Sequence, residues 1–228
     1  MTAKILSVIV APAVFWLLYH VYKDRYRPEP PIRLGIAFFL GSLAGFLCLE
    51  AYRLANRLGA ATDPFALAER DPFGFFVYAV LAVGVVEEVA KFLPFALICL
   101  RFREFDERID GLIYASAVGL GFAAYENLVY MQMLTGPALL GRALASPLVH
   151  AMFASIWGDA VARARFEGRS IARASVGGLA LAAVVHGIYD FVVLAVPASV
   201  RPIAAAIVLA IWIWRIRLIQ RLQREARE

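Results

Sequence analysis

Residues 73–100 read FGFFVYAVLAVGVVEEVAKFLPFALICL, and this stretch decides the fold. It is long enough to cross a bilayer, because a spanning helix needs roughly 20 predominantly apolar residues. It nevertheless carries Glu87, Glu88 and Lys91 near its middle. An ionisable side chain at membrane depth costs about 2.5–3.5 kcal/mol on insertion scales, so such residues commonly face the bundle interior and mark a functional site. The stretch therefore predicts a membrane helix that contributes to a polar site.

The composition of the whole chain is that of an integral membrane protein. Of the 228 residues, 62% are hydrophobic and 18% are charged, whereas soluble domains average about 45–50% apolar and about 25% charged residues. The sequence therefore predicts an all-α, polytopic membrane helix bundle in which residues 1–228 form a single membrane domain. About seven transmembrane helices are expected, at residues 5–22, 34–54, 73–100, 111–134, 144–161, 174–196 and 198–214.

The basic residues indicate membrane topology and not a nucleic-acid partner. The formal net charge is +5, but the lysines and arginines flank the apolar segments. With seven helices, 16 of them fall on one side of the membrane and 6 on the other. Cytoplasmic loops carry the excess of Lys and Arg, so we expect the N-terminus outside and the C-terminus in the cytoplasm. No cleavage site follows the first apolar run, which indicates a retained helix.

Three further predicted helices also carry ionisable residues at membrane depth. Glu126, His150 and His186 each lie within a different helix, and Asp190 follows His186 by four residues. Residues at i and i+4 share a helix face, so Asp190 can orient the His186 imidazole. Together with the helix at residues 73–100, four predicted helices therefore carry ionisable residues at membrane depth. This pattern predicts one polar site assembled inside the bundle.

Two kinds of chemistry suit these residues. Two histidines and a buried carboxylate match the ligand set of a catalytic zinc site. The same groups suit a metal-free site with a general acid or base and an oxyanion stabiliser. Structural roles are the alternative, because Lys91 can form an ion pair with Glu87 or Glu88 one turn away. A second adjacent glutamate exceeds what an ion pair needs, so the pattern favours catalysis.

A proton- or cation-coupled transporter is the main alternative function, because it also needs buried Glu, His and Lys residues. Many transporters contain repeats and helices broken at the midplane. This sequence has no internal repeat, and only Pro94 interrupts a helix near the acids. A non-catalytic receptor or chaperone is a third interpretation, which the full set of acids and histidines disfavours. Cys48 and Cys99 both lie in apolar runs, so we expect no cysteine-ligated metal.

Five short motifs occur in order along the chain. They are EExxK at 87–91, FDExxDG at 105–111, FxxxEN at 122–127, a lone helix histidine at 150, and HGxYDF at 186–191. In these motifs the chain resembles the PrsW family of polytopic intramembrane proteases, which are distant relatives of CAAX-processing proteases. The resemblance covers roughly residues 10–215. Each motif alone is weak, whereas five in one order are specific.

The resemblance implies an intramembrane endopeptidase, a hydrolase of the bacterial cell (inner) membrane. Its implied substrates are membrane-anchored proteins such as anti-sigma factors, and its water is activated by buried glutamates with stabilisation by histidine or metal. The implied catalytic residues are Glu87, Glu88, Glu126, His150 and His186. The implied supporting residues are Lys91, Glu107, Asn127 and Asp190.

The resemblance leaves the cofactor undecided between none and one divalent metal ion. If zinc is present, His150, His186 and Glu126 are its expected ligands. The charge balance slightly favours a metal-free site, since a shared proton can offset surplus carboxylate charge. Glu87 is the expected base, although the motif alone does not distinguish it from Glu88. The substrate, its cleavage site and the oligomeric state are also left open.

Local spacing gives three further expectations. Asp159 and Arg163 are four residues apart in a predicted helix, which predicts an ion pair. His20 is expected at the membrane interface, at the cytoplasmic end of the first helix. Gly41 and Gly45 form a small-residue pattern that predicts close helix packing.

Overall fold

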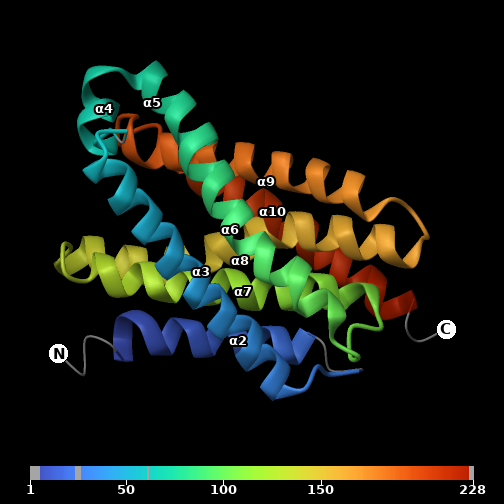
Figure 1. The fold of residues 1–228 in the computed structure, drawn as a ribbon. Helices are drawn as coiled ribbons and strands as arrows, with labels where there is room; N and C mark the ends of the chain where they lie inside the picture. The colour runs from blue at the N-terminus through green and yellow to red at the C-terminus, as the bar shows by residue number, and fades with distance from the viewer. Residues whose placement is uncertain (1–5, 24–26, 61, 226–228) are drawn as a thin grey trace.

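The computed structural model describes residues 6–23, 27–60 and 62–225. Every regular element in these ranges is helical, as Figure 1 shows. In chain order the elements are η1 (Leu6–Val10), α2 (Ala11–Lys23), α3 (Pro31–Arg57), α4 (Pro64–Arg70), α5 (Pro72–Tyr78), η2 (Ala79–Gly84), α6 (Val85–Leu97), η3 (Cys99–Arg101), α7 (Arg108–Tyr130), α8 (Gly136–Phe166), α9 (Ile171–Leu194) and α10 (Pro202–Glu225).

Six helical stretches within the described residues are long and apolar enough to cross a membrane. They are Pro31–Arg57, Pro72–Arg101, Arg108–Tyr130, Gly136–Phe166, Ile171–Leu194 and Pro202–Glu225. A shorter apolar helix, Ser7–Lys23, lies where the sequence predicts the first span. The predicted all-α, polytopic membrane bundle is therefore confirmed, and the chain is a multi-pass membrane protein. Its orientation and the seventh span stay predictions.

Two helices extend well beyond their apolar segments. α8 begins at Gly136 rather than at residue 144, and α10 continues to Glu225 rather than ending at residue 214. Polar turns can continue a helix past the hydrocarbon, because its backbone hydrogen bonds are made internally. The earlier start of α8 puts His150 near the middle of a 31-residue helix.

The connection between the predicted helices at residues 34–54 and 73–100 contains a helix of its own, α4. Asp63 Oδ1 accepts a hydrogen bond from the backbone N–H of Phe65 at 2.9 Å. Asp71 Oδ1 accepts one from the backbone N–H of Gly74, also at 2.9 Å. A proline follows each aspartate at the first helical position, where a missing N–H costs nothing. Asp63 and Asp71 therefore cap the starts of α4 and α5.

Helix α7 forms the centre of the bundle, with α3 and α8 packed against it. A Cβ at Gly41 of α3 would overlap the backbone carbonyl of Val118. A Cβ at Gly119 would lie 2.6 Å from the carbonyl oxygen of His150 on α8. Gly45 also faces α7, so the predicted close packing of this helix is confirmed. Small residues thus let three helix backbones approach directly.

One local prediction is wrong, and the membrane-interface position of His20 stays a prediction. Asp159 pairs with Arg108 at 2.9 Å and not with Arg163, because the start of α7 lies against the end of α8. His20 is buried within the bundle, with only 1% of its surface exposed. The reason is that α10 covers this part of α2, where Trp212 packs against neighbouring aromatic rings.

The two ends of the bundle carry different connections. Figure 1 shows the α8–α9 connection, the start of α7 and the end of α10 at one end. Helices α4 and α5, the end of α3 and the start of α8 lie at the other. The first of these ends contains the arginine-rich segments and is the predicted cytoplasmic end.

Candidate active site

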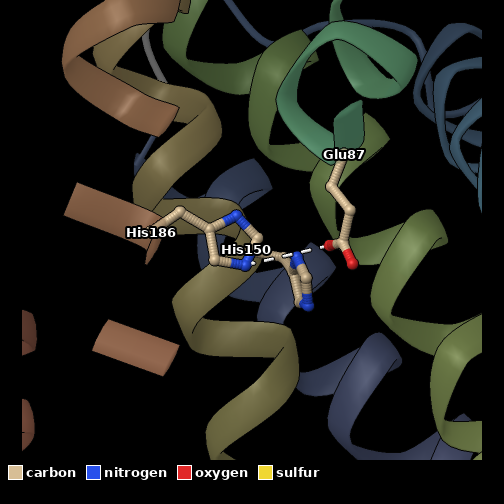
Figure 2. Close-up of side chains that lie close together, drawn as sticks. All are labelled: Glu87, His150 and His186. Atoms are coloured by element: carbon tan, nitrogen blue, oxygen red, sulfur yellow. Dashed lines mark ion pairs between the residues drawn. The ribbon is translucent and has the colours of Figure 1, made fainter. Parts of the chain in front are cut away.

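Seven of the predicted site residues come together inside the bundle. They are Glu87, Glu88 and Lys91 from α6, Glu126 from α7, His150 from α8, and His186 and Asp190 from α9. Figure 2 shows three of these side chains, Glu87, His150 and His186, converging from three different helices. Five of the seven residues are buried, and Glu126 and Asp190 are half-buried.

Close backbone contacts set the spacing of this cluster. A Cβ at Gly187, the neighbour of His186, would lie 2.5 Å from the Cα of Val80 on η2. A Cβ at Gly84 would overlap a backbone carbonyl of α9. Only residues without a Cβ permit such an approach. Helix α9 therefore lies directly against η2, which leads into α6 and so brings His186 opposite Glu87.

Glu88 has both carboxylate oxygens occupied. Its Oε1 accepts hydrogen bonds from Lys91 Nζ at 2.6 Å and from His186 Nδ1 at 2.8 Å. Its Oε2 accepts one from Trp157 Nε1 at 2.9 Å. A buried carboxylate is tolerated when it is paired and hydrogen-bonded in this way. Glu88 therefore links α6, α8 and α9 as part of the framework.

Glu87 is buried as well, but its carboxylate is not satisfied. Its Oε2 has no hydrogen-bond partner within the described part of the chain. Lys91 Nζ lies 3.7 Å away and His186 Nε2 lies 3.8 Å away, both beyond hydrogen-bond distance. A buried polar atom in this state calls for a proton, a water molecule or an ion. Of the two glutamates, Glu87 is the one that is free to react.

His186 presents an acceptor nitrogen to Glu87. The Glu88 carboxylate only accepts, so the proton of the neutral imidazole lies on Nδ1 and is donated to Glu88. Nε2 is then an acceptor, 3.8 Å from Glu87 Oε2 along the dashed line in Figure 2. Asp190 Oδ2 lies 3.6 Å from the same nitrogen. Glu88 therefore orients the imidazole ring through a hydrogen bond at Nδ1, and Asp190 lies near the other ring nitrogen, Nε2.

His150 connects Lys91 to Glu126. Lys91 Nζ is 3.0 Å from His150 Nδ1, and Glu126 Oε2 is 2.8 Å from His150 Nε2. An ammonium group only donates and a carboxylate only accepts, so Nδ1 is the acceptor and Nε2 the donor. These two neighbours fix His150 as one neutral tautomer.

Sequence reasoning misses two residues of the cluster, Arg142 and Trp157. Arg142 Nη2 contacts Glu126 Oε1 at 2.8 Å, and its guanidinium lies 3.5 Å above the Tyr130 ring. Arg142 precedes His150 by eight residues and Trp157 follows it by seven, which places all three on one helix face. This spacing could have predicted that Arg142 faces the site. The predicted helix, however, begins at residue 144, which places Arg142 in a loop.

Two predicted supporting residues lie away from the cluster. Asn127 donates from Nδ2 to the backbone carbonyl of Val8 at 3.4 Å, which joins α7 to the first helix. Glu107 precedes α7 at the end opposite Glu126 and pairs with Arg27 at 3.0 Å. Partial burial raises the pKa of the Glu107 carboxyl, while the charge of Arg27 opposes this shift. Both contacts are at helix ends.

A divalent metal ion fits three residues of the cluster. Glu87, His150 and His186 each offer a ligand atom, and these atoms lie within 4.8 Å of one another. The set is two histidines and a carboxylate, as in many catalytic zinc sites. Glu126, the carboxylate expected from the sequence, already contacts Arg142 and His150, whereas Glu87 Oε2 has no hydrogen-bond partner among the described residues. His150 would give up one of its two present contacts on binding the ion.

The fold and the cluster define a class of protein. It is a multi-pass membrane protein with a buried centre of acids and histidines where several helices meet. A family model described as PrsW family intramembrane metalloprotease matches residues 29–215. The match covers most of the chain, which therefore belongs to the PrsW family. The chain is a protease, and hence a hydrolase.

Curated relatives agree with this assignment. Protease PrsW of Clostridioides difficile is 32% identical over 81% of this chain and 77% of its own length. Protease PrsW of Bacillus subtilis is 31% identical over 84% of this chain and 83% of its own. Protease PrsW of Geobacillus kaustophilus is 29% identical over 84% and 80%. No solved structure matches the chain. The family expected from the motifs is confirmed.

Proposed function

We propose that this chain is an endopeptidase that hydrolyses a peptide bond of membrane-anchored protein substrates at the centre formed by Glu87, His150 and His186. The observation that carries the proposal is Glu87 Oε2, which has no hydrogen-bond partner among the described residues and lies 3.8 Å from the acceptor nitrogen of His186. One water molecule can donate hydrogen bonds to both acceptors. A water held there lies beside a carboxylate base.

Glu87 acts as the general base in this proposal. It takes a proton from the water as the water oxygen attacks the carbonyl carbon of the substrate. It then gives that proton to the amine nitrogen as the C–N bond breaks. A positioned base of this kind contributes about 10²–10⁴-fold to the rate. Glu88, with all its acceptors occupied, holds His186 in place.

Lys91, held in place by its contact with His150, stabilises the negative charge that develops on the carbonyl oxygen. Lys91 uses two of its three N–H groups on Glu88 and His150, at 2.6 and 3.0 Å. One N–H donor of the ammonium group remains for the oxyanion, in a site that is buried within the bundle. Glu126, held by Arg142 at 2.8 Å, supports the base indirectly by keeping His150 oriented.

A zinc ion is compatible with the same residues. Glu87, His150 and His186 would hold it, and when bound it would polarise the substrate carbonyl and activate water. The description of the family as metalloproteases supports this assignment. Glu88 would then serve as the partner that orients the His186 ligand.

The proposed substrates are bacterial anti-sigma factors, and the proposed location is the bacterial inner membrane. Both rest on the family, and the three relatives described above are bacterial proteins. A transporter using the same buried residues has no support from these relatives, each of which is named as a protease.

The test is N-terminal labelling and mass spectrometry of membranes from cells that express the chain or its Glu87→Gln variant. Glutamine keeps the size of the side chain but removes the base. New N-termini in membrane-anchored proteins should appear with the unchanged chain and be absent with Glu87→Gln. Glu69→Gln, the same change at an exposed position of α4, is the matched control and should retain them. The same cleavages in the Glu87→Gln sample would contradict the proposal.

A further inference from the structure

A second site lies between α8, α9 and α10, near the arginine-rich end of the bundle seen in Figure 1. It is a cavity of about 940 Å³, at the upper end of the roughly 300–1,000 Å³ typical of ligand pockets. Its described lining residues include none of the catalytic cluster. A Cβ at Gly177, on its wall, would meet no atom within 4 Å. The cavity is therefore an open groove between membrane helices.

One end of this groove carries arginines whose charge is not compensated. Arg163, Arg169 and Arg173 line it, together with the carboxylate of Asp159. Asp159 is already paired with the start of α7, and Arg169 is paired with Glu167 at 2.6 Å. The guanidinium groups of Arg163 and Arg173 have no acidic partner among the residues that the structure describes. Arg163 and Arg173 thus give this end of the groove two positive charges that no described acidic residue neutralises.

The other part of the groove is apolar. Leu181 and Val185 of α9 form one wall, and Ala210, Ile211 and Trp214 of α10 form the other. Leu181 and Trp214 are exposed, at 55% and 38%, and both lie in helices that are long and apolar enough to cross a membrane. A tryptophan next to basic residues is typical of the level where acyl chains meet headgroups.

We propose that this groove binds an anionic phospholipid, with its phosphate on Arg163 and Arg173 and an acyl chain along Leu181, Ala210 and Trp214. Guanidinium groups bind phosphate oxygens through paired, charge-assisted hydrogen bonds. Basic pockets between transmembrane helices on the cytoplasmic side are known to bind anionic headgroups. Only a ligand that is anionic at one end and apolar at the other matches both parts of the groove. An apolar substrate helix would leave the two arginines uncompensated.

The bound lipid would contact the helices that carry His150 and His186, since α8 and α9 form two walls of the groove. The site is nevertheless independent of the proposed reaction. Lipid binding can therefore be measured in a catalytically inactive chain, and its failure would leave the assignment of the catalytic residues untouched.

The test is native mass spectrometry of delipidated full-length protein titrated with phosphatidylglycerol or with phosphatidylcholine in detergent micelles. We expect phosphatidylglycerol to bind at least about 10-fold more tightly, from the charge of two arginines. Arg163→Gln combined with Arg173→Gln should abolish the preference. The matched control is Arg217→Gln with Arg224→Gln, which removes the same charge from exposed positions of α10 outside the groove. The control should keep the preference.

A second variant tests the groove itself without changing its charge. Ala210→Trp fills the apolar part, so it should reduce bound phosphatidylglycerol although both arginines are present. Equal losses in the two arginine double variants would overturn the proposal, because the preference would then reflect overall charge. Unchanged binding by Ala210→Trp would also overturn it, because headgroups would then bind outside the groove. Size-exclusion profiles and thermal unfolding verify that each variant is folded.

Discussion

Replacing Glu88 by glutamine should destabilise the bundle, whereas the same change at Glu87 should leave it folded. Glutamine has one acceptor oxygen and one NH₂ group, but Glu88 accepts hydrogen bonds with both of its oxygens. Lys91 and His186 donate to Oε1, and Trp157 donates to Oε2. In the variant, at least one of these donors must face an NH₂ group. Lys91 also loses the carboxylate that offsets its buried charge at 2.6 Å.

The expected loss of stability follows from the charge of Lys91, which has lost its closest carboxylate partner in the variant. Removing one partner of a buried ion pair costs about 3–5 kcal/mol, because the remaining charge is uncompensated. We expect Glu88→Gln to lower the free energy of unfolding by this amount, measured by SDS titration in micelles with circular dichroism. Glu87 Oε2 makes no hydrogen bond to the described residues, so Glu87→Gln should change the same free energy by less than about 1 kcal/mol.

Lys91→Met tests whether the uncompensated charge is the cause. Combined with Glu88→Gln, it removes that charge, so the double variant should be about 1–3 kcal/mol more stable than Glu88→Gln alone. A double variant no more stable than the single one would refute the reasoning. Equal destabilisation by Glu87→Gln and Glu88→Gln would refute it as well.

Three further predictions concern topology, packing and metal. A cysteine at Arg103 should resist a membrane-impermeant thiol reagent in intact cells, and one within residues 56–70 should react; the reverse pattern would invert the orientation. Gly187→Ala should cost about 1–3 kcal/mol of stability and reduce cleavage, because its Cβ would lie 2.5 Å from Val80 Cα; unchanged melting and activity would contradict the close contact. If the site holds zinc, desalted protein previously equilibrated with zinc should retain about one ion per chain by mass spectrometry, and His186→Ala none. No retention by the unchanged chain would favour the metal-free site, and equal retention would exclude His186 as a ligand.

The membrane helices are predictable from the sequence because hydrophobicity over about 20 residues is a local property. Their ends are less predictable, since polar turns extend a helix beyond the bilayer without a change in backbone hydrogen bonding. This is why α10 continues to Glu225 and α8 begins at Gly136. The burial of His20 depends on α10 packing over α2, which is a tertiary contact that no local pattern contains.

Seven members of the cluster are also predictable, because ionisable residues are rare at membrane depth; Arg142 and Trp157 are not. The pairings within the cluster are not predictable either, because they depend on how separate helices meet. The i, i+4 spacing favours Asp190 as the partner of His186, yet Glu88 from α6 makes the 2.8 Å contact. Asp159 likewise has a partner at i+4 but pairs with Arg108 from another helix. At Asp159 tertiary packing overrides helical spacing, whereas at His186 it adds a closer partner beside Asp190, which lies 3.6 Å from Nε2.

The measurement that tests the central claim most directly is the rate at which Glu87→Gln cleaves a membrane-anchored substrate in proteoliposomes, using a substrate identified by N-terminal labelling. Glu69→Gln is measured beside it, and unfolding in SDS verifies that both variants are folded. The account predicts a fall of at least about 10²-fold for Glu87→Gln and an unchanged rate for Glu69→Gln. A folded Glu87→Gln protein that cleaves at the rate of the unchanged chain would contradict the account.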